Sequence, residues 1–84
     1  MERLTYAVDV TPIPFVGFAG WCRDLPEVHA FGCDPASVLE QMADSMALTC
    51  LALISGGRLP PVPTALEPGE CWLSASAAAL TQPA

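Results

Sequence analysis

The sequence of 84 residues contains no lysine, and its only basic residues are Arg3, Arg23 and Arg58. Nine aspartate and glutamate residues give it a formal net charge of −6. Binding to nucleic-acid phosphates or to an anionic membrane surface needs clustered basic side chains, so this composition argues against both. An acidic surface instead suits solubility, or binding to a basic protein.

The chain also has little that would direct it to a membrane or out of the cell. Its longest apolar run, from Met46 to Ile54, is interrupted by Thr49, whereas a membrane-spanning helix needs about 20 apolar residues. The first residues, Met1 to Leu4, do not begin the basic head and apolar block of a signal peptide. We therefore expect a soluble, cytoplasmic protein with no membrane partner.

Cysteines are few, and no two of them form a C-x-x-C pair. The four are Cys22, Cys33, Cys50 and Cys71. In a secreted protein they could form two disulfides, and a metal site is the other alternative. Because no signal peptide is expected and 52% of the residues are hydrophobic, we expect reduced cysteines that pack as small apolar residues.

The apolar residues that are present suffice for one small globular domain. Only 14% of the residues are charged, which excludes the composition of a disordered chain. A chain of 84 residues is too short for two cores. We expect a single domain over residues 1–76 and a short alanine-rich tail over residues 77–84.

Hydrophobic periodicity predicts three strands in the first part of the chain. Apolar and polar residues alternate from Leu4 to Val10, which is the period of a strand. We expect this strand to end at Thr11–Pro14, because proline has no N–H to donate to a sheet. A second strand is predicted over Phe15–Cys22 and a third over Glu27–Gly32.

A long helix is predicted next. Asp34 is a good N-cap, and Pro35 is tolerated in the first turn. Apolar residues recur at three- and four-residue spacing up to Ile54, and Gly56-Gly57 supplies a left-handed C-cap. With a last strand over Glu70–Ser76, the sequence predicts an α+β fold in the order β-β-β-α-β. Its three- to four-stranded, mainly antiparallel sheet has one long helix packed on one face.

A single helix can cover only one face of such a sheet. Phe15 and Trp21 are predicted to point to one face, Val16 and Phe18 to the other, and the end of the helix is apolar nearly all round. Soluble monomers rarely leave a large apolar patch in water. We therefore expect a homo-oligomer, a dimer or a tetramer, or a firm protein partner. The expected oligomer interface comprises Phe15, Phe18, Leu48 and Leu51.

Several residues occur in an order that is specific although each is a weak signal alone. They are Tyr6, the aromatic and glycine-rich stretch Phe15–Trp21, Asp24-Leu25-Pro26, Gly32, the helix Pro35–Ile54, Gly57, Leu59-Pro60 and Pro63-Thr64. This order resembles the N-terminal domain of HicB antitoxins over about residues 4–75. The chain departs from the family at Glu27, where glycine is usual, and at Gly32-Cys33-Asp34, where Gly-Asp-Thr is usual. Asp34 can cap the helix in place of threonine.

The resemblance implies a partial ribonuclease H-like fold without nuclease activity. It also implies a partner, a small, basic, mRNA-cleaving HicA toxin that the antitoxin covers, and the net charge of −6 fits such a partner independently. HicB proteins often carry a C-terminal DNA-binding module; we expect this chain to be a stand-alone domain that binds no operator directly. We expect the partner to contact the turn after the second strand, with an aromatic anchor. The residues are Trp21, Arg23, Asp24, Leu25, Pro26 and Glu27.

Two other functions remain as alternatives. One is an orphan HicB-like oligomeric scaffold or regulatory subunit that has no toxin. The other is a metal-dependent ribonuclease that would use Asp9, Glu40 and Glu70. Carboxylates for two-metal catalysis must converge on the ions, and Glu40 falls on the polar side of the predicted helix, so this alternative is disfavoured.

The remaining reactive groups favour no catalytic, metal or cofactor site. His29 shares a predicted strand face with Cys33 and lies near Cys22 across the preceding turn. Zinc ligands, however, usually pair within two to five residues. Cys50 falls on the apolar stripe of the helix with no base beside it. We therefore expect a non-enzymatic protein without a cofactor.

Overall fold

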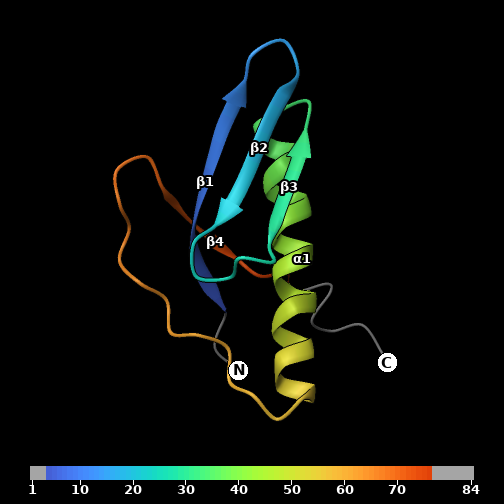
Figure 1. The fold of residues 1–84 in the computed structure, drawn as a ribbon, viewed down its shortest axis with the longest axis vertical. Coiled ribbons are helices and arrows are strands. Elements are labelled where there is room, and N and C mark those ends of the chain that lie inside the picture. Colours follow the sequence, from blue (N-terminus) through green and yellow to red (C-terminus); the bar gives the residue numbers. More distant parts are fainter. Residues whose placement is uncertain (1–3, 77–84) are drawn as a thin grey trace.

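The computed structural model describes residues 4–76, and it confirms the α+β fold (Figure 1). Four strands form one antiparallel sheet in the order β3-β2-β1-β4, and one long helix packs against one face of it. The predicted tail, residues 77–84, lies outside the described residues. The elements are β1 (Thr5–Ile13), β2 (Gly17–Cys22), β3 (His29–Gly32), α1 (Pro35–Ser55) and β4 (Cys71–Ser74).

The prediction that the first strand ends at Thr11–Pro14 is wrong. β1 continues to Ile13, and Pro12 pairs with Phe18 of β2. β4 pairs only with Thr5–Val8, so the other side of β1 is open at Pro12. A proline whose nitrogen faces an open edge costs the sheet no hydrogen bond.

A tight turn joins β1 to β2, which is why β2 begins at Gly17 and not at Phe15. The N–H of Val16 donates to the C=O of Ile13 at 3.0 Å. Phe15 has a φ of 65°, a left-handed conformation that is uncommon for residues other than glycine, and its side chain is fully exposed. β3 and β4 are also shorter than predicted.

Both predicted caps of α1 are present. The Asp34 carboxylate accepts a hydrogen bond from a backbone N–H of the first turn at 2.8 Å. At the other end Gly57 has a φ of 78°. The N–H of Arg58 donates to the C=O of Leu53 at 2.8 Å, which is the bond of a Schellman C-cap. These local signals fix the two ends of the helix.

By length and composition α1 could also cross a membrane. A core helix of a globular protein passes the same test, and one face of α1 is packed against the sheet. The completely buried residues of this face are Val38, Met42, Met46, Ala47 and Cys50. Ile54, which the spacing places on the same stripe, is instead 51% exposed.

The core lies between α1 and the side of the sheet that carries Tyr6 and Val8. Gly20 of β2 lies where α1 and the sheet approach most closely. A Cβ atom on Gly20 would collide with Sδ of Met42 and would lie 2.7 Å from Cγ1 of Val38. The absence of a side chain at Gly20 therefore sets the distance between helix and sheet.

We expect Gly20→Val to lower the free energy of unfolding by about 1–3 kcal/mol, because the added side chain overpacks the contact with α1. Chemical denaturation measures the change. Ala19→Val is the matched control, since its side chain points to the other side of the sheet, and we expect a change below about 0.5 kcal/mol. Equal destabilisation by both substitutions would contradict this packing.

Candidate functional site

The side of the sheet opposite α1 carries three large aromatic residues, Trp21, Phe31 and Trp72, which we call the aromatic face. Each is about half exposed, at 50%, 50% and 49%. Trp21 pairs with Asp9 of β1, and Trp72 pairs with Ala7, two residues earlier in the same strand. Phe31 pairs with the residue two positions before Trp21. Because strand residues two apart point to the same side, all three rings share one surface.

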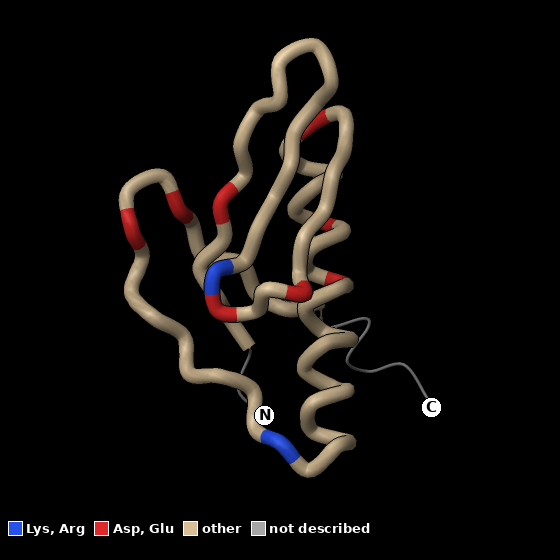
Figure 2. The backbone as a smooth tube through the Cα atoms, viewed as in Figure 1, with Lys and Arg blue, Asp and Glu red and all other residues tan. Residues whose placement is uncertain are grey.

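The surroundings of the aromatic face are acidic. Asp9 lies directly opposite Trp21, and its carboxylate accepts a hydrogen bond from the Thr11 hydroxyl at 3.3 Å. Figure 2 shows acidic residues on β1, in the turn after β2, on α1 and in the segment leading to β4. Within the described residues only Arg23 and Arg58 carry positive charge. This distribution is complementary to a basic partner.

The turn after β2 anchors the long segment between α1 and β4. The Arg23 guanidinium lies 2.9 Å from the carboxylates of both Glu67 and Glu70. Asp24 accepts hydrogen bonds from the N–H of Thr64 at 2.9 Å and from its hydroxyl at 3.0 Å. We call these contacts the Arg23 anchor. A single exposed ion pair contributes little to stability, but here several contacts converge on one turn and fix the course of the segment.

The predicted partner surface is therefore only partly available. The expectation that Leu25 contacts a partner is corrected, because Leu25 is 2% exposed and belongs to the core. The turn folds it inward, with the N–H of Val28 donating to its C=O at 2.9 Å. Arg23 and Asp24 are engaged in the Arg23 anchor. The predicted residues that are exposed and uncommitted are Trp21, Pro26 and Glu27.

The residues predicted to form an oligomer interface do not share one surface. Phe18 points toward α1 and is partly buried against the core, so it is a packing residue. Phe15 lies at the turn between β1 and β2, and Leu48 is 59% exposed on α1. Leu51, also on α1, is partly buried. Only the two α1 residues therefore lie on the same element.

Neither candidate cluster of reactive residues comes together. His29 is exposed on the side of the aromatic face, whereas Cys22 is buried on the opposite side, so their side chains do not point toward one another. Asp9 lies on the sheet side away from α1, Glu40 is exposed on α1, and Glu70 is held in the Arg23 anchor. Among residues 4–76, no group of three or more His, Cys, Asp or Glu could hold a metal ion.

A small polar cluster is buried in the core around Tyr6. The Tyr6 hydroxyl donates to the C=O of Pro61 at 2.7 Å. Burial, and to a smaller extent the neighbouring Cys50, raises the pKa of Tyr6 to about 12. Burial also raises the pKa of the Cys22 and Cys50 thiols. Both thiols are therefore neutral near pH 7 and poor nucleophiles. All four cysteines are free, with Cys33 and Cys71 exposed.

Because Tyr6 is the only tyrosine of the chain, its titration can be followed by phenolate absorbance. We expect a pKa of about 12 in the folded protein and about 10 in denaturant. The folded pKa is the higher one, so this contribution to stability is complete below about pH 10 and is lost as the pH rises toward 12. Titration of the folded protein near pH 10 would contradict the buried hydroxyl.

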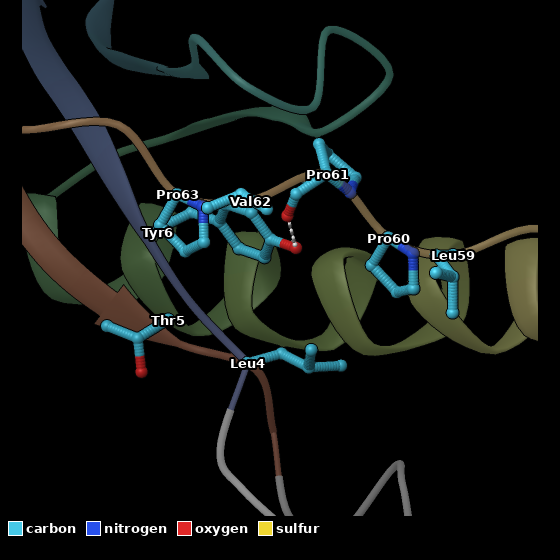
Figure 3. Close-up of a pocket in the computed structure, with 8 residues that line it drawn as sticks. All are labelled: Leu4, Thr5, Tyr6, Leu59, Pro60, Pro61, Val62 and Pro63. Carbon is cyan, nitrogen blue, oxygen red and sulfur yellow. Dashed lines mark hydrogen bonds between the residues drawn. The ribbon is translucent and has the colours of Figure 1, made fainter.

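A groove lies between the start of β1 and the proline-rich segment Leu59–Pro63, with a volume of about 460 Å³ (Figure 3). Its β1 side is formed by Leu4, Thr5 and Tyr6. The Tyr6 hydroxyl is the only ionisable group of these walls, and it is already bonded to Pro61. Apart from Tyr6, the only side-chain hydroxyl of these walls is that of Thr5, which is hydrogen-bonded to the Ser74 hydroxyl at 2.9 Å, and no charged side chain lines the groove.

Phe31 and Trp72 are candidates that the sequence alone does not reveal as binding residues. Trp72 is flanked by Cys71 and Leu73, so the pattern does not say which side of its strand faces solvent. Only the pairing of Trp72 with Ala7 places it beside Trp21. The side of the sheet that Trp72 faces is therefore set by the register of strand pairing, which the sequence alone does not give.

Comparison of the chain with models of known protein families, and with curated proteins, gives no match. The fold class is established by the structure.

Proposed function

We propose that this protein is a non-enzymatic, antitoxin-like module that neutralises a small, basic, mRNA-cleaving toxin of the HicA type. It would bind the toxin and cover the surface that holds RNA, with no chemical step. The single observation that carries the proposal is the aromatic face, with three half-exposed rings on a chain of net charge −6. The resemblance to HicB antitoxins over residues 4–75 supports it.

The aromatic face has the chemistry of a protein-binding surface. Tryptophan is enriched among the residues that contribute most to binding, and such residues lie near the centre of an interface. A lysine or arginine of a partner can also lie over an indole ring, and cation–π contacts are strongest with tryptophan. Asp9, opposite Trp21, would pair with the same cation. An RNA-binding toxin supplies such cations, because RNA binding itself requires them.

The acidic charge would raise the rate of association with the toxin as well as the affinity for it. Opposite charges steer two proteins together and raise the association rate constant, an effect that salt screens. An antitoxin needs fast association, because it competes with RNA for the toxin. In this proposal the protein works in the cytoplasm, where the toxin's mRNA substrate is found.

Co-expression tests the proposal. The toxin would be the product of a short open reading frame beside this gene that encodes a basic protein with a catalytic histidine. We expect the toxin alone to arrest growth, co-expression to restore growth, and the two proteins to elute as one complex. Persistent arrest with both proteins soluble and no complex would contradict the proposal. So would the absence of a toxin frame, which would favour the scaffold alternative.

The ribonuclease alternative has its own test. If the purified protein cleaved RNA with magnesium and Asp9→Asn abolished the cleavage, the protein would be an enzyme. We expect no cleavage by either form, because Asp9, Glu40 and Glu70 do not converge on one site, and two-metal catalysis requires that they do.

A further inference from the structure

The second half of α1 presents an apolar surface that residues 4–76 leave uncovered. The last completely buried residue of the helix is Cys50, and Figure 1 shows the final turns extending beyond the strands. Leu48 is 59% and Ile54 is 51% exposed, and the partly buried Leu51 lies between them. This surface, which we call the helix patch, comprises Leu48, Leu51 and Ile54. It is separate from the aromatic face, which lies on the other side of the sheet.

The helix patch lies within the longest uncharged stretch of the helix. No charged residue occurs from Ser45 to Gly57, and the helical part of this stretch, which ends at Ser55, is about 16 Å long at the rise of an α-helix. In the sequence, Asp44 precedes the stretch and Arg58 follows it. Two copies of a chain of net charge −6 repel each other over most of their surfaces. On the helix patch they can meet without bringing carboxylates together.

The sequence of the helix patch is complementary to itself in the antiparallel direction. Leu48 and Ile54 both lie three positions from Leu51, and Asp44 and Arg58 both lie seven positions from it. In an antiparallel pair with its two-fold axis at Leu51, Leu48 packs against Ile54 of the partner subunit. Asp44 then lies toward Arg58 of the partner subunit, which follows the C-cap of that helix and is not part of it. Within residues 4–76 both ion pairs belong to Arg23, so Arg58 is not engaged by a carboxylate of its own described chain.

We infer that a second copy of this chain binds at the helix patch, forming a dimer of antiparallel α1 helices around a two-fold axis at Leu51. Such an interface is isologous, with each contact made twice, and helices pack at 8–10 Å through side chains of this size. A lipid surface is the less fitting occupant, because helices that lie on membranes carry basic residues on their polar side. Here the only charged residues of α1 are the acidic Glu40 and Asp44.

Dimer formation through the helix patch does not require the proposed toxin. Because the helix patch and the aromatic face are on different sides of the molecule, one dimer could present two aromatic faces to two partners. The dimer would exist before any partner is added.

Sedimentation equilibrium of the purified chain tests this. We expect a mass twice that of the 8.8 kDa chain for the wild type. Leu48→Glu should weaken the dimer at least about tenfold, because it buries a charge against Ile54 of the partner subunit. Val62→Glu is the matched control, since Val62 is 83% exposed and lies in the segment after α1, outside the helix patch, and it should remain dimeric. Circular dichroism confirms that each variant is folded.

Reversing the charges of Asp44 and Arg58 tests the antiparallel register of the dimer. Arg58→Asp and Asp44→Arg should each weaken the dimer, because each places like charges together, and the double variant should restore it. A wild type that is monomeric up to millimolar concentration would overturn the inference. A dimer that survives Leu48→Glu and is lost in Trp21→Ser would place the contact on the aromatic face instead. Binding of a monomeric wild type to anionic phospholipid vesicles would show that a membrane covers the helix patch.

Discussion

Replacing Trp21 by alanine is expected to weaken binding of the proposed toxin partner by at least about 30-fold. That factor corresponds to the loss of about 2 kcal/mol, the lower limit for a residue that dominates an interface. Trp21 is half exposed near the end of β2, between β1 and β3, and lies opposite Asp9. Isothermal titration calorimetry with a catalytically inactive toxin measures the change.

The control for Trp21→Ala is Phe15→Ala. Phe15 is also aromatic and fully exposed, but it lies at the turn between β1 and β2 and not on the aromatic face. We expect its replacement to change the affinity by less than about threefold, the effect of a peripheral residue. If both substitutions weakened binding equally, the aromatic face would not be the specific contact surface.

Replacing Met46 by alanine is expected to lower the free energy of unfolding by about 2–5 kcal/mol, because it leaves a cavity in the core. Met46 is completely buried where α1 faces the sheet. A protein of 84 residues has a stability of only about 4–13 kcal/mol at the usual value per residue. The variant should therefore unfold at a much lower denaturant concentration, or be partly unfolded without denaturant.

Leu59→Ala is the comparison for Met46→Ala. Leu59 is 89% exposed in the segment after α1, so removing most of its side chain leaves no cavity. We expect a change within about 0.5 kcal/mol. A small effect at Met46 would show that the helix does not pack on the sheet as described.

The helix could be predicted from the sequence because its signals are local. Asp34 bonds to a residue three positions away, and Gly57 adopts the left-handed conformation that glycine permits. The apolar period identifies the buried face through Met42 and Met46. The order of the elements follows from such local patterns, and so does the fold class.

The ends of the strands could not be predicted, because they depend on which edge is paired. Pro12 is tolerated inside β1 only because β4 leaves that side open, and the length of β4 is not a local property. The same limit applies to Trp72, whose direction follows from its pairing with Ala7. When both sides of a sheet are apolar, the sequence pattern does not show which side chains face solvent. Their exposure is set by the register of strand pairing.

The contacts of the Arg23 anchor could not be predicted from the sequence either. Its bonds join the turn after β2 to residues about forty positions later, and no periodicity reports contacts at that separation. The sequence marks the turn as exposed and polar, which suits a partner surface equally well. The buried position of Leu25 within that turn is likewise a product of the tertiary fold.

Tryptophan fluorescence tests the central claim most directly, because the only two tryptophans, Trp21 and Trp72, both lie on the aromatic face. In the free protein we expect the emission of solvent-exposed indole and efficient quenching by acrylamide. Adding an inactive toxin that lacks tryptophan should shift the emission to shorter wavelength and protect both rings from the quencher. A complex that forms while the spectrum and the quenching stay unchanged would contradict the claim.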